Sequence, residues 1–183
     1  MRPLPEAGTA SGPAGGSALE RFAARLLAQR GYLAEAALLI ASVPGPVLEI
    51  GLGKGRTYDH LRRLLPGRAI YGFDREHHAP AEESPPPERL VIGEIQTTLP
   101  ALAQRLGAKA ALAHCDIGTR KPERDMAFAR YLAAALPDVM AEGAIVLGDR
   151  PMEAPRLEAL PAPDYARPEG IEAWPYYLYR VRI

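Results

Sequence analysis

The 183-residue sequence predicts a single α/β domain of the doubly wound kind, with helices on both faces of a mostly parallel sheet. Short apolar segments, bounded by Gly, Pro or acidic residues, alternate with stretches of helical spacing. Strands that are apolar throughout and separated by helices are typical of a parallel sheet. The expected strands cover residues 47–50, 69–73, 90–92, 110–115 and 144–147. The expected helices cover 57–65, 99–106 and 122–136, with stops at Gly67, Gly107 and Pro137.

The amino-terminal part of the sequence changes character at Ser17. Residues 1–16 are rich in Pro, Gly, Ala and Ser and predict a flexible tail. Ser17 and Glu20 have the spacing of a capping box, and apolar residues then recur on one helical face as far as residue 41. Gly31 either ends this helix or only interrupts it. We therefore expect one domain over 17–183, composed of a helical cap over 17–43 and a core over 44–183.

Two segments depart from the regular alternation. Segment 77–88 lies where a crossover helix is expected, but its four prolines disfavour a full helix. We expect an extended or single-turn crossover there. Segment 176–183 is an aromatic and β-branched run and predicts a last strand.

Charge and cysteine content limit the classes of function. Lys and Arg together number 22, as do Asp and Glu, so the formal net charge is zero and disfavours a nucleic-acid partner. The single cysteine excludes an intrachain disulfide and a multi-cysteine zinc site. The sequence shows neither a secretory signal nor an apolar run of about 18 residues. We therefore expect a cytoplasmic protein without a membrane partner.

The stretch VLEIGLGKGRTYDHL, residues 47–61, places three glycines between a predicted strand and a predicted helix. Gly51, Gly53 and Gly55 let a ligand approach the backbone, and the helix directs its amide groups toward that ligand. In a doubly wound sheet, ligands bind at the carboxyl ends of the strands. Asp74 follows the next predicted strand, where a carboxylate can accept hydrogen bonds from ribose hydroxyls. The pattern predicts a nucleotide-like cofactor.

The glycine spacing and Glu49 discriminate between such cofactors. A dinucleotide-binding loop has the pattern Gly-x-Gly-x-x-Gly, whereas here the third glycine comes one residue early. Glu49 precedes Gly51 by two residues, and its charge would repel a pyrophosphate but attract the ammonium group of an amino acid. A nicotinamide-dependent oxidoreductase is therefore the less favoured interpretation.

With an acidic residue before Gly-x-Gly-x-Gly, residues 49–55 resemble the first motif of the class I S-adenosylmethionine-dependent methyltransferases. The resemblance covers residues 47–183 and is to a small bacterial branch of that superfamily. It implies a Rossmann-like sheet of about seven strands with an antiparallel last strand, and S-adenosylmethionine as methyl donor. Gly51, Gly53 and Gly55 would line the methionine moiety and the adjoining sugar, and Asp74 would hold the ribose. Glu94 would face the adenine amino group, with Ile95 beside it as an apolar wall.

Two aspartates after the fourth and fifth predicted strands are the candidates for the acceptor side. The resemblance implies that Asp116 contacts or activates the acceptor, and Asp149 is the second candidate. Metal-dependent catechol-type members of the superfamily hold magnesium with carboxylates at these two strand ends. The place of a third ligand is taken here by Arg150, which cannot coordinate a cation, so we expect no metal.

The acceptor itself is constrained by how little of the chain is available to cover the site. Only the cap and residues 151–174 remain for this purpose, so we expect a small-molecule acceptor, or one whose site a second subunit of a homo-oligomer completes. Cys115 and His114 are interpreted as structural, and the aromatic residues around Tyr176 as core or as an acceptor platform. A non-catalytic module that binds S-adenosylmethionine is the alternative function.

Overall fold

The computed structural model describes residues 16–119 and 121–183, so the predicted tail lies outside the described residues except for Gly16. The strands are β1 (Val47–Ile50), β2 (Ile70–Asp74), β3 (Leu90–Ile92), β4 (Ala110–Cys115), β5 (Met140–Gly148), β6 (Leu157–Ala159) and β7 (Tyr177–Val181). They form a seven-stranded sheet in the order β3-β2-β1-β4-β5-β7-β6. The first five strands along the chain are parallel, whereas β7 pairs antiparallel with both β5 and β6. The doubly wound fold and its antiparallel last strand are therefore confirmed.

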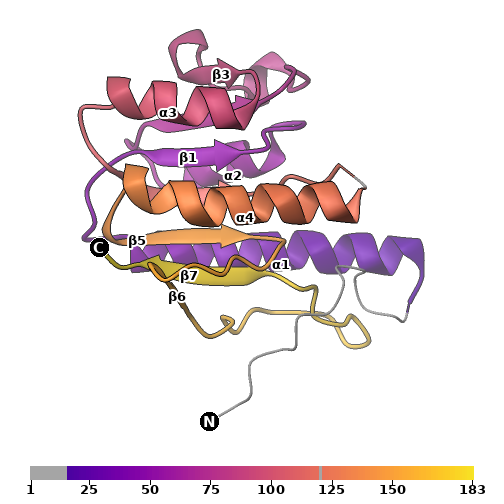
Figure 1. Ribbon diagram of the computed structural model, residues 1–183. Coiled ribbons are helices and arrows are strands. Elements are labelled where there is room, and N and C mark those ends of the chain that lie inside the picture. The colour runs from indigo at the N-terminus through magenta and orange to yellow at the C-terminus, as the bar shows by residue number, and fades with distance from the viewer. Residues whose placement is uncertain (1–15, 120) are drawn as a thin grey trace.

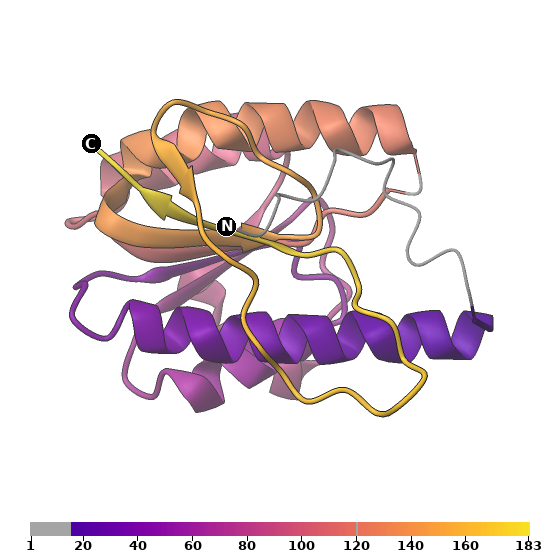
Figure 2. The ribbon, with the colours of Figure 1, turned by 90° about the horizontal axis from the view of Figure 1, so that it is seen from below.

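Helices cover both faces of this sheet, as predicted. They are α1 (Ala18–Leu39), α2 (Arg56–Leu64), α3 (Ile95–Arg105) and α4 (Pro122–Val139). α1 and α2 lie on one face, and α3 and α4 on the other (Figures 1 and 2). Each face buries its own apolar cluster, one containing Leu33 and Leu61 and the other containing Leu99 and Leu132. Among the described residues, no helix has both the length and the apolarity needed to cross a membrane.

α1 begins at the predicted capping box. The Ser17 hydroxyl accepts a hydrogen bond from the Glu20 amide at 3.2 Å, and the Glu20 carboxylate accepts one from the Ser17 amide. Gly31 lies inside one continuous helix and does not end it. A Cβ at Gly31 would lie 2.6 Å from Cβ of Tyr165, so the absence of a side chain lets the segment after β6 pack onto α1.

Several predicted boundaries were wrong, each for a local reason. α3 begins at Ile95, before the predicted start at residue 99, and contains Pro100. α4 continues through Pro137, because a proline this close to the helix end removes only one helical hydrogen bond. β5 begins at Met140, before the predicted start at residue 144, and includes the polar residue Glu142. β6 was not predicted, since its three residues are too few to show a pattern.

The proline-rich segment between β2 and β3 forms two single 3-10 turns, η1 (Ala81–Glu83) and η2 (Pro87–Arg89), as the predicted single-turn crossover requires. The segment packs closely on the sheet and on the loop after β1. A Cβ at Gly72 would lie 2.7 Å from Cγ of Pro85, and one at Gly55 would lie 2.0 Å from the backbone oxygen of Glu83. The crossover therefore supports the glycine loop directly.

Candidate functional site

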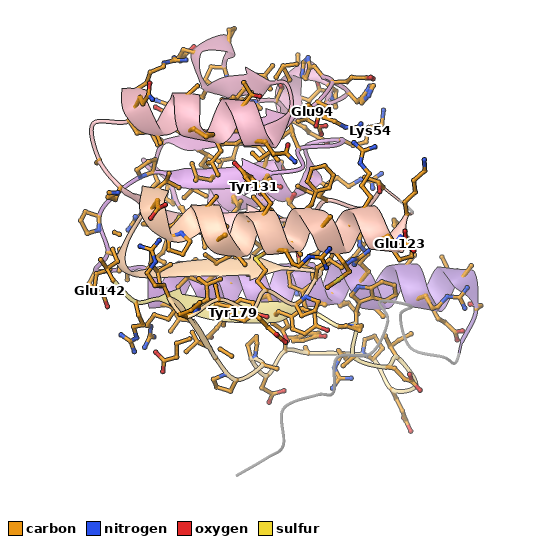
Figure 3. All side chains as sticks on the ribbon, viewed as in Figure 1. Lys54, Glu94, Glu123, Tyr131, Glu142 and Tyr179 are labelled. Carbon is orange, nitrogen blue, oxygen red and sulfur yellow. The ribbon has the colours of Figure 1, made fainter. Side chains whose placement is uncertain are left out.

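The parallel strands all end at one edge of the sheet, which we call the carboxyl edge and which lies at the right in Figure 1. α1 starts beyond this edge and overhangs it in both views (Figures 1 and 2). Figure 3 shows Lys54 and Glu94 on the same side, and Glu142 at the opposite edge. The topology thus brings the predicted site residues to one edge, as expected for a ligand site in this fold.

The glycine loop between β1 and α2 is shaped by two internal contacts and one open position. Gly51, Gly53 and Gly55 have φ of +92°, +52° and +77°, in the left-handed region that favours glycine. A Cβ on Gly51 would lie 2.2 Å from the backbone oxygen of Asp116, and one on Gly55 would meet Glu83. Among the described residues, no neighbouring atom lies within 4 Å of the corresponding position at Gly53. The loop therefore has an open backbone surface that a ligand can approach.

Asp74, at the end of β2, is tied to this loop. One carboxylate oxygen accepts a hydrogen bond from the Gly53 amide at 2.7 Å, and the other accepts one from the Arg75 amide at 2.7 Å. Each oxygen can accept a further bond, since a carboxylate has about four acceptor sites. The side chain is therefore oriented beside the open glycine and able to accept ribose hydroxyls.

Glu94 and Ile95 differ in what they can offer a ligand. The Gly93 amide donates to the backbone oxygen of Asp74 at 2.9 Å, which places Glu94 next to the end of β2. Glu94 is the N-cap residue of α3, but its side chain makes no capping hydrogen bond and is exposed. Ile95 is 6% exposed and belongs to the core cluster with Leu99. The Glu94 side chain can thus be reached by a ligand, whereas Ile95, the first residue of α3, packs into the core.

Glu49 is enclosed in a buried polar network between the sheet and α1. Its side chain is 0% exposed, and its two oxygens accept hydrogen bonds from the Thr57 hydroxyl and, at 2.7 Å, from Nδ1 of His114. Nε2 of His114 bonds to the Tyr176 hydroxyl at 2.5 Å. Burial alone lowers the pKa of His114, but the Glu49 carboxylate, aided by Asp116 and Asp149, raises it above its ordinary value. The network links β1, β4, α2 and the residue before β7.

Asp116 follows β4 directly and binds α1. Nη2 of Arg25 donates to both of its carboxylate oxygens, at 2.5 and 2.7 Å, and Nε2 of Gln29 donates to one of them at 2.5 Å. These contacts join residues that are 91 and 87 positions apart in the sequence. In this structure, the Asp116 carboxylate therefore anchors the overhanging helix.

Asp149, just after β5, is a buried carboxylate of a different kind. It is 5% exposed and pairs with Nη1 of Arg150 at 2.7 Å, while Nη2 of Arg150 reaches Asp125 at 3.2 Å. Burial and the neighbouring Asp116 charge raise the pKa of Asp149 to about 6, although Arg150, Arg25 and His114 oppose the shift. A carboxyl group with such a pKa changes charge near neutral pH.

Comparison with known proteins assigns this arrangement to a family. A family model described as S-adenosyl-L-methionine methyltransferase matches residues 16–181. The chain belongs to this methyltransferase family. The methyltransferase therefore uses S-adenosylmethionine as its co-substrate, and the open glycine loop with the oriented Asp74 carboxylate fits a nucleoside. No curated protein matches the sequence.

Solved structures agree with this assignment. The methyltransferase is similar to an S-adenosyl-L-methionine methyl transferase from Silicibacter pomeroyi DSS-3, with 37% identity and a TM-score of 0.79 over 91% of this chain and 99% of that one. Cofactor-bound Rv0187 from MTB shares the fold, with 18% identity and a TM-score of 0.56 over 92% of each chain. TrmN from Thermus thermophilus also shares the fold, with 16% identity and a TM-score of 0.58 over 87% of this chain and 53% of that one.

Three further features of the methyltransferase were considered as sites: metal-binding side chains, the Cys115 thiol and a hollow at the amino edge of the sheet. The described residues contain no group of three or more His, Cys, Asp or Glu side chains placed to hold a metal ion. The Cys115 thiol is buried, and burial raises its pKa well above the ordinary value, so it is a poor nucleophile. A hollow of about 390 Å³ lies at the amino edge of the sheet, away from the carboxyl edge, lined by residues such as Pro44, Arg68 and Gly107.

Sequence reasoning missed the contribution of α1 and of the chain just before β7. Arg25 and Gln29 have the i, i+4 spacing that places two side chains on one side of a helix, but nothing local indicates that this side faces the end of β4. The one feature in the sequence that could have indicated this network is His114, a polar residue within an apolar strand that needs a buried hydrogen-bond partner. Its partner, Glu49, lies directly across from it on the neighbouring strand.

The raised pKa of Asp149 predicts a specific pH dependence of stability. The pKa of Asp149 is about 6 in the folded protein, compared with an ordinary value of 3.8. Protonated Asp149 therefore favours the folded state. This contribution to stability is fully present below pH 3.8 and is lost as the pH rises through about 6. Relative to Asp149→Asn, the wild type should therefore lose on the order of 3 kcal/mol between about pH 4 and pH 7.5. Urea unfolding of both proteins across this range measures the difference. Parallel pH profiles would show that Asp149 titrates normally.

Proposed function

We propose that this methyltransferase transfers the methyl group by in-line displacement to a small-molecule acceptor bound beside Asp149. The observation that carries the proposal is the buried carboxyl group of Asp149 at the carboxyl edge, with its pKa raised to about 6. A general base works best when its pKa lies near the working pH, and such a base contributes about 10²- to 10⁴-fold to the rate. Asp149 is suited to take a proton from a hydroxyl or a protonated amine.

Asp149 is a better candidate for this role than Asp116. Arg25 and Gln29 donate three hydrogen bonds to Asp116, so its carboxylate is occupied mainly in holding α1. The sulfonium of the donor makes its methyl group electrophilic without assistance. The protein's main task is then alignment, which can supply about 7 to 11 kcal/mol.

Two observations support a small acceptor. α1 overhangs the carboxyl edge and is fastened there through Arg25, which restricts access from that side (Figure 1). The formal net charge of zero gives no excess of cations for a nucleic-acid backbone.

The decisive experiment offers radiolabelled donor to separated small-molecule, RNA and protein fractions of a cell extract. Label should enter the small-molecule fraction with the wild type and not with Asp149→Asn, whose donor affinity should be unchanged. Label in RNA or protein alone would contradict the proposal.

For the donor itself, we infer that Gly51, Gly53, Gly55, Asp74 and Glu94 form the nucleoside side of its site. Asp74 is the strongest test, because its carboxylate is oriented by the Gly53 amide and retains free acceptor sites.

Asp74→Ala is expected to weaken binding of S-adenosylhomocysteine about 10- to 150-fold, the equivalent of about 1.5 to 3 kcal/mol for hydrogen bonds to a charged group. Calorimetric titration measures the affinity, with NAD and ATP as ligands that should not bind. Glu82→Ala, which removes an exposed carboxylate from the nearby crossover, is the control and should bind normally. Unchanged affinity of the Asp74 variant would mean that the ribose is held elsewhere.

A further inference from the structure

The amino-acid end of the methyl donor carries an ammonium and a carboxylate, and both charges need partners. The sequence favoured Glu49 for the ammonium. In the structure, the Glu49 side chain is 0% exposed, and Thr57 and His114 already donate to its two oxygens. A ligand ammonium would have to enter this fully buried space and displace one of these bonds. Glu49 is therefore poorly placed for direct contact with the donor.

A second pair of opposite charges lies nearer the surface, next to the first glycine of the loop. The backbone oxygen of Asp116 lies 2.2 Å from the position of a Cβ on Gly51, so Asp116 and the loop are in direct contact. The Asp116 side chain is 11% exposed, and that of Arg25 is 31% exposed. These two charged groups, unlike Glu49, can be reached from the carboxyl edge.

Both members of this pair have unused hydrogen-bonding capacity. Arg25 donates to Asp116 only through Nη2, and within the described ranges its Nη1 and Nε make no hydrogen bond. One oxygen of Asp116 accepts two bonds and the other accepts one, which leaves an acceptor site. A guanidinium with a free fork is suited to a carboxylate, and a carboxylate with a free acceptor site is suited to an ammonium.

We propose that Arg25 and Asp116 bind the amino-acid end of the donor, Arg25 through the donor carboxylate and Asp116 through its ammonium. This inference rests on the proposed donor site and extends it from the glycine loop to α1. The Arg25–Asp116 ion pair then has two roles, since it fastens the helix and presents both charges to the ligand. Glu49 acts indirectly, by holding His114 and Thr57 beneath the site.

The test compares two ligands that differ only in the carboxylate, S-adenosylmethionine and decarboxylated S-adenosylmethionine. Calorimetric titration of the wild type should show the first ligand binding about 10- to 100-fold more tightly, as expected for a charge-assisted pair. Arg25→Ala should abolish this preference by weakening S-adenosylmethionine alone. Arg25→Lys, which keeps the charge without the forked geometry, should retain part of it.

Arg30→Ala is the matched control, because Arg30 is an exposed arginine five residues further along α1. It should keep the full preference of the wild type. A wild type that binds both ligands equally, or an Arg25→Ala variant that still prefers S-adenosylmethionine, would overturn the inference while leaving the donor site intact. A wild type that binds neither ligand would overturn the proposed donor site itself.

Discussion

Replacing His114 with alanine is expected to lower the free energy of unfolding by about 3 to 5 kcal/mol, the usual cost of removing one partner from a buried pair. His114 donates to or accepts from two groups, Glu49 at 2.7 Å and the Tyr176 hydroxyl at 2.5 Å. The Glu49 carboxylate is 0% exposed, and without the imidazole it would keep only Thr57 as a hydrogen-bond partner among the described residues. Urea unfolding followed by circular dichroism gives the value.

Two further variants separate the buried charge from the lost hydrogen bonds. Tyr176→Phe removes only the hydroxyl at the far end of the network and should cost about 1 kcal/mol. Adding Glu49→Gln to His114→Ala removes the unpaired charge, so the double variant should recover part of the lost stability. If His114→Ala costs no more than Tyr176→Phe, the Glu49–His114 pair does not stabilise the fold as described.

The second large effect is expected at Gly55. An alanine there must adopt a left-handed backbone, at φ +77°, and its Cβ would lie 2.0 Å from the backbone oxygen of Glu83. The conformation costs about 1 to 2 kcal/mol, and the overlap costs about 1 to 3 kcal/mol more. Because the overlap is with backbone, the crossover must move away from the glycine loop. Gly55→Ala should therefore lose both stability and affinity for S-adenosylhomocysteine.

Gly67→Ala is the matched control that measures only the cost of placing alanine in a left-handed backbone conformation. Gly67 has φ +87°, but in the part of the chain that the structure describes no neighbouring atom lies within 4 Å of the position of its Cβ. It lies at the amino edge of the sheet, away from the site. Gly67→Ala should therefore lose only the stability that the left-handed conformation costs, and its affinity for S-adenosylhomocysteine should be normal. Equal losses of stability in the two variants would indicate that the crossover yields easily and does not support the loop.

The fold could be predicted because its signals are local. Apolar strands, the capping box at Ser17 and the prolines between β2 and β3 each specify their own conformation, and the structure confirms them. The wrong boundaries have local causes, such as Pro137, which lies in the last turn of α4, removes only one helical hydrogen bond and does not end the helix. The sequence left the role of Gly31 open, and the structure places it inside α1. β6 has only three residues, too few to show a strand pattern, and in the described part of the chain it lies at the edge of the sheet, paired with β7.

The conformation of the glycine loop was predictable for the same reason, since Gly51, Gly53, Gly55 and Asp74 belong to one strand-turn-helix-strand unit. The partners of the acidic residues were not predictable. The contact of Arg25 with Asp116 depends on how α1 crosses the sheet, which the helix sequence alone does not specify. The pairing of Glu49 with His114 depends on β1 and β4 being neighbours, although they are separated along the chain by two other strands.

The position of β7 between β5 and β6 has a consequence for biosynthesis. A ribosome makes β5 and β6 first, so β5 has an unpaired edge until residues 177–181 have emerged. Ile145, Val146 and Leu147 on that strand are fully buried in the finished domain, and an open apolar strand of this kind readily pairs with other chains. Tyr176, which completes the His114 network, arrives at the same late moment. The nascent chain is therefore most exposed to aggregation just before the insertion of β7 closes the sheet and completes the network around His114.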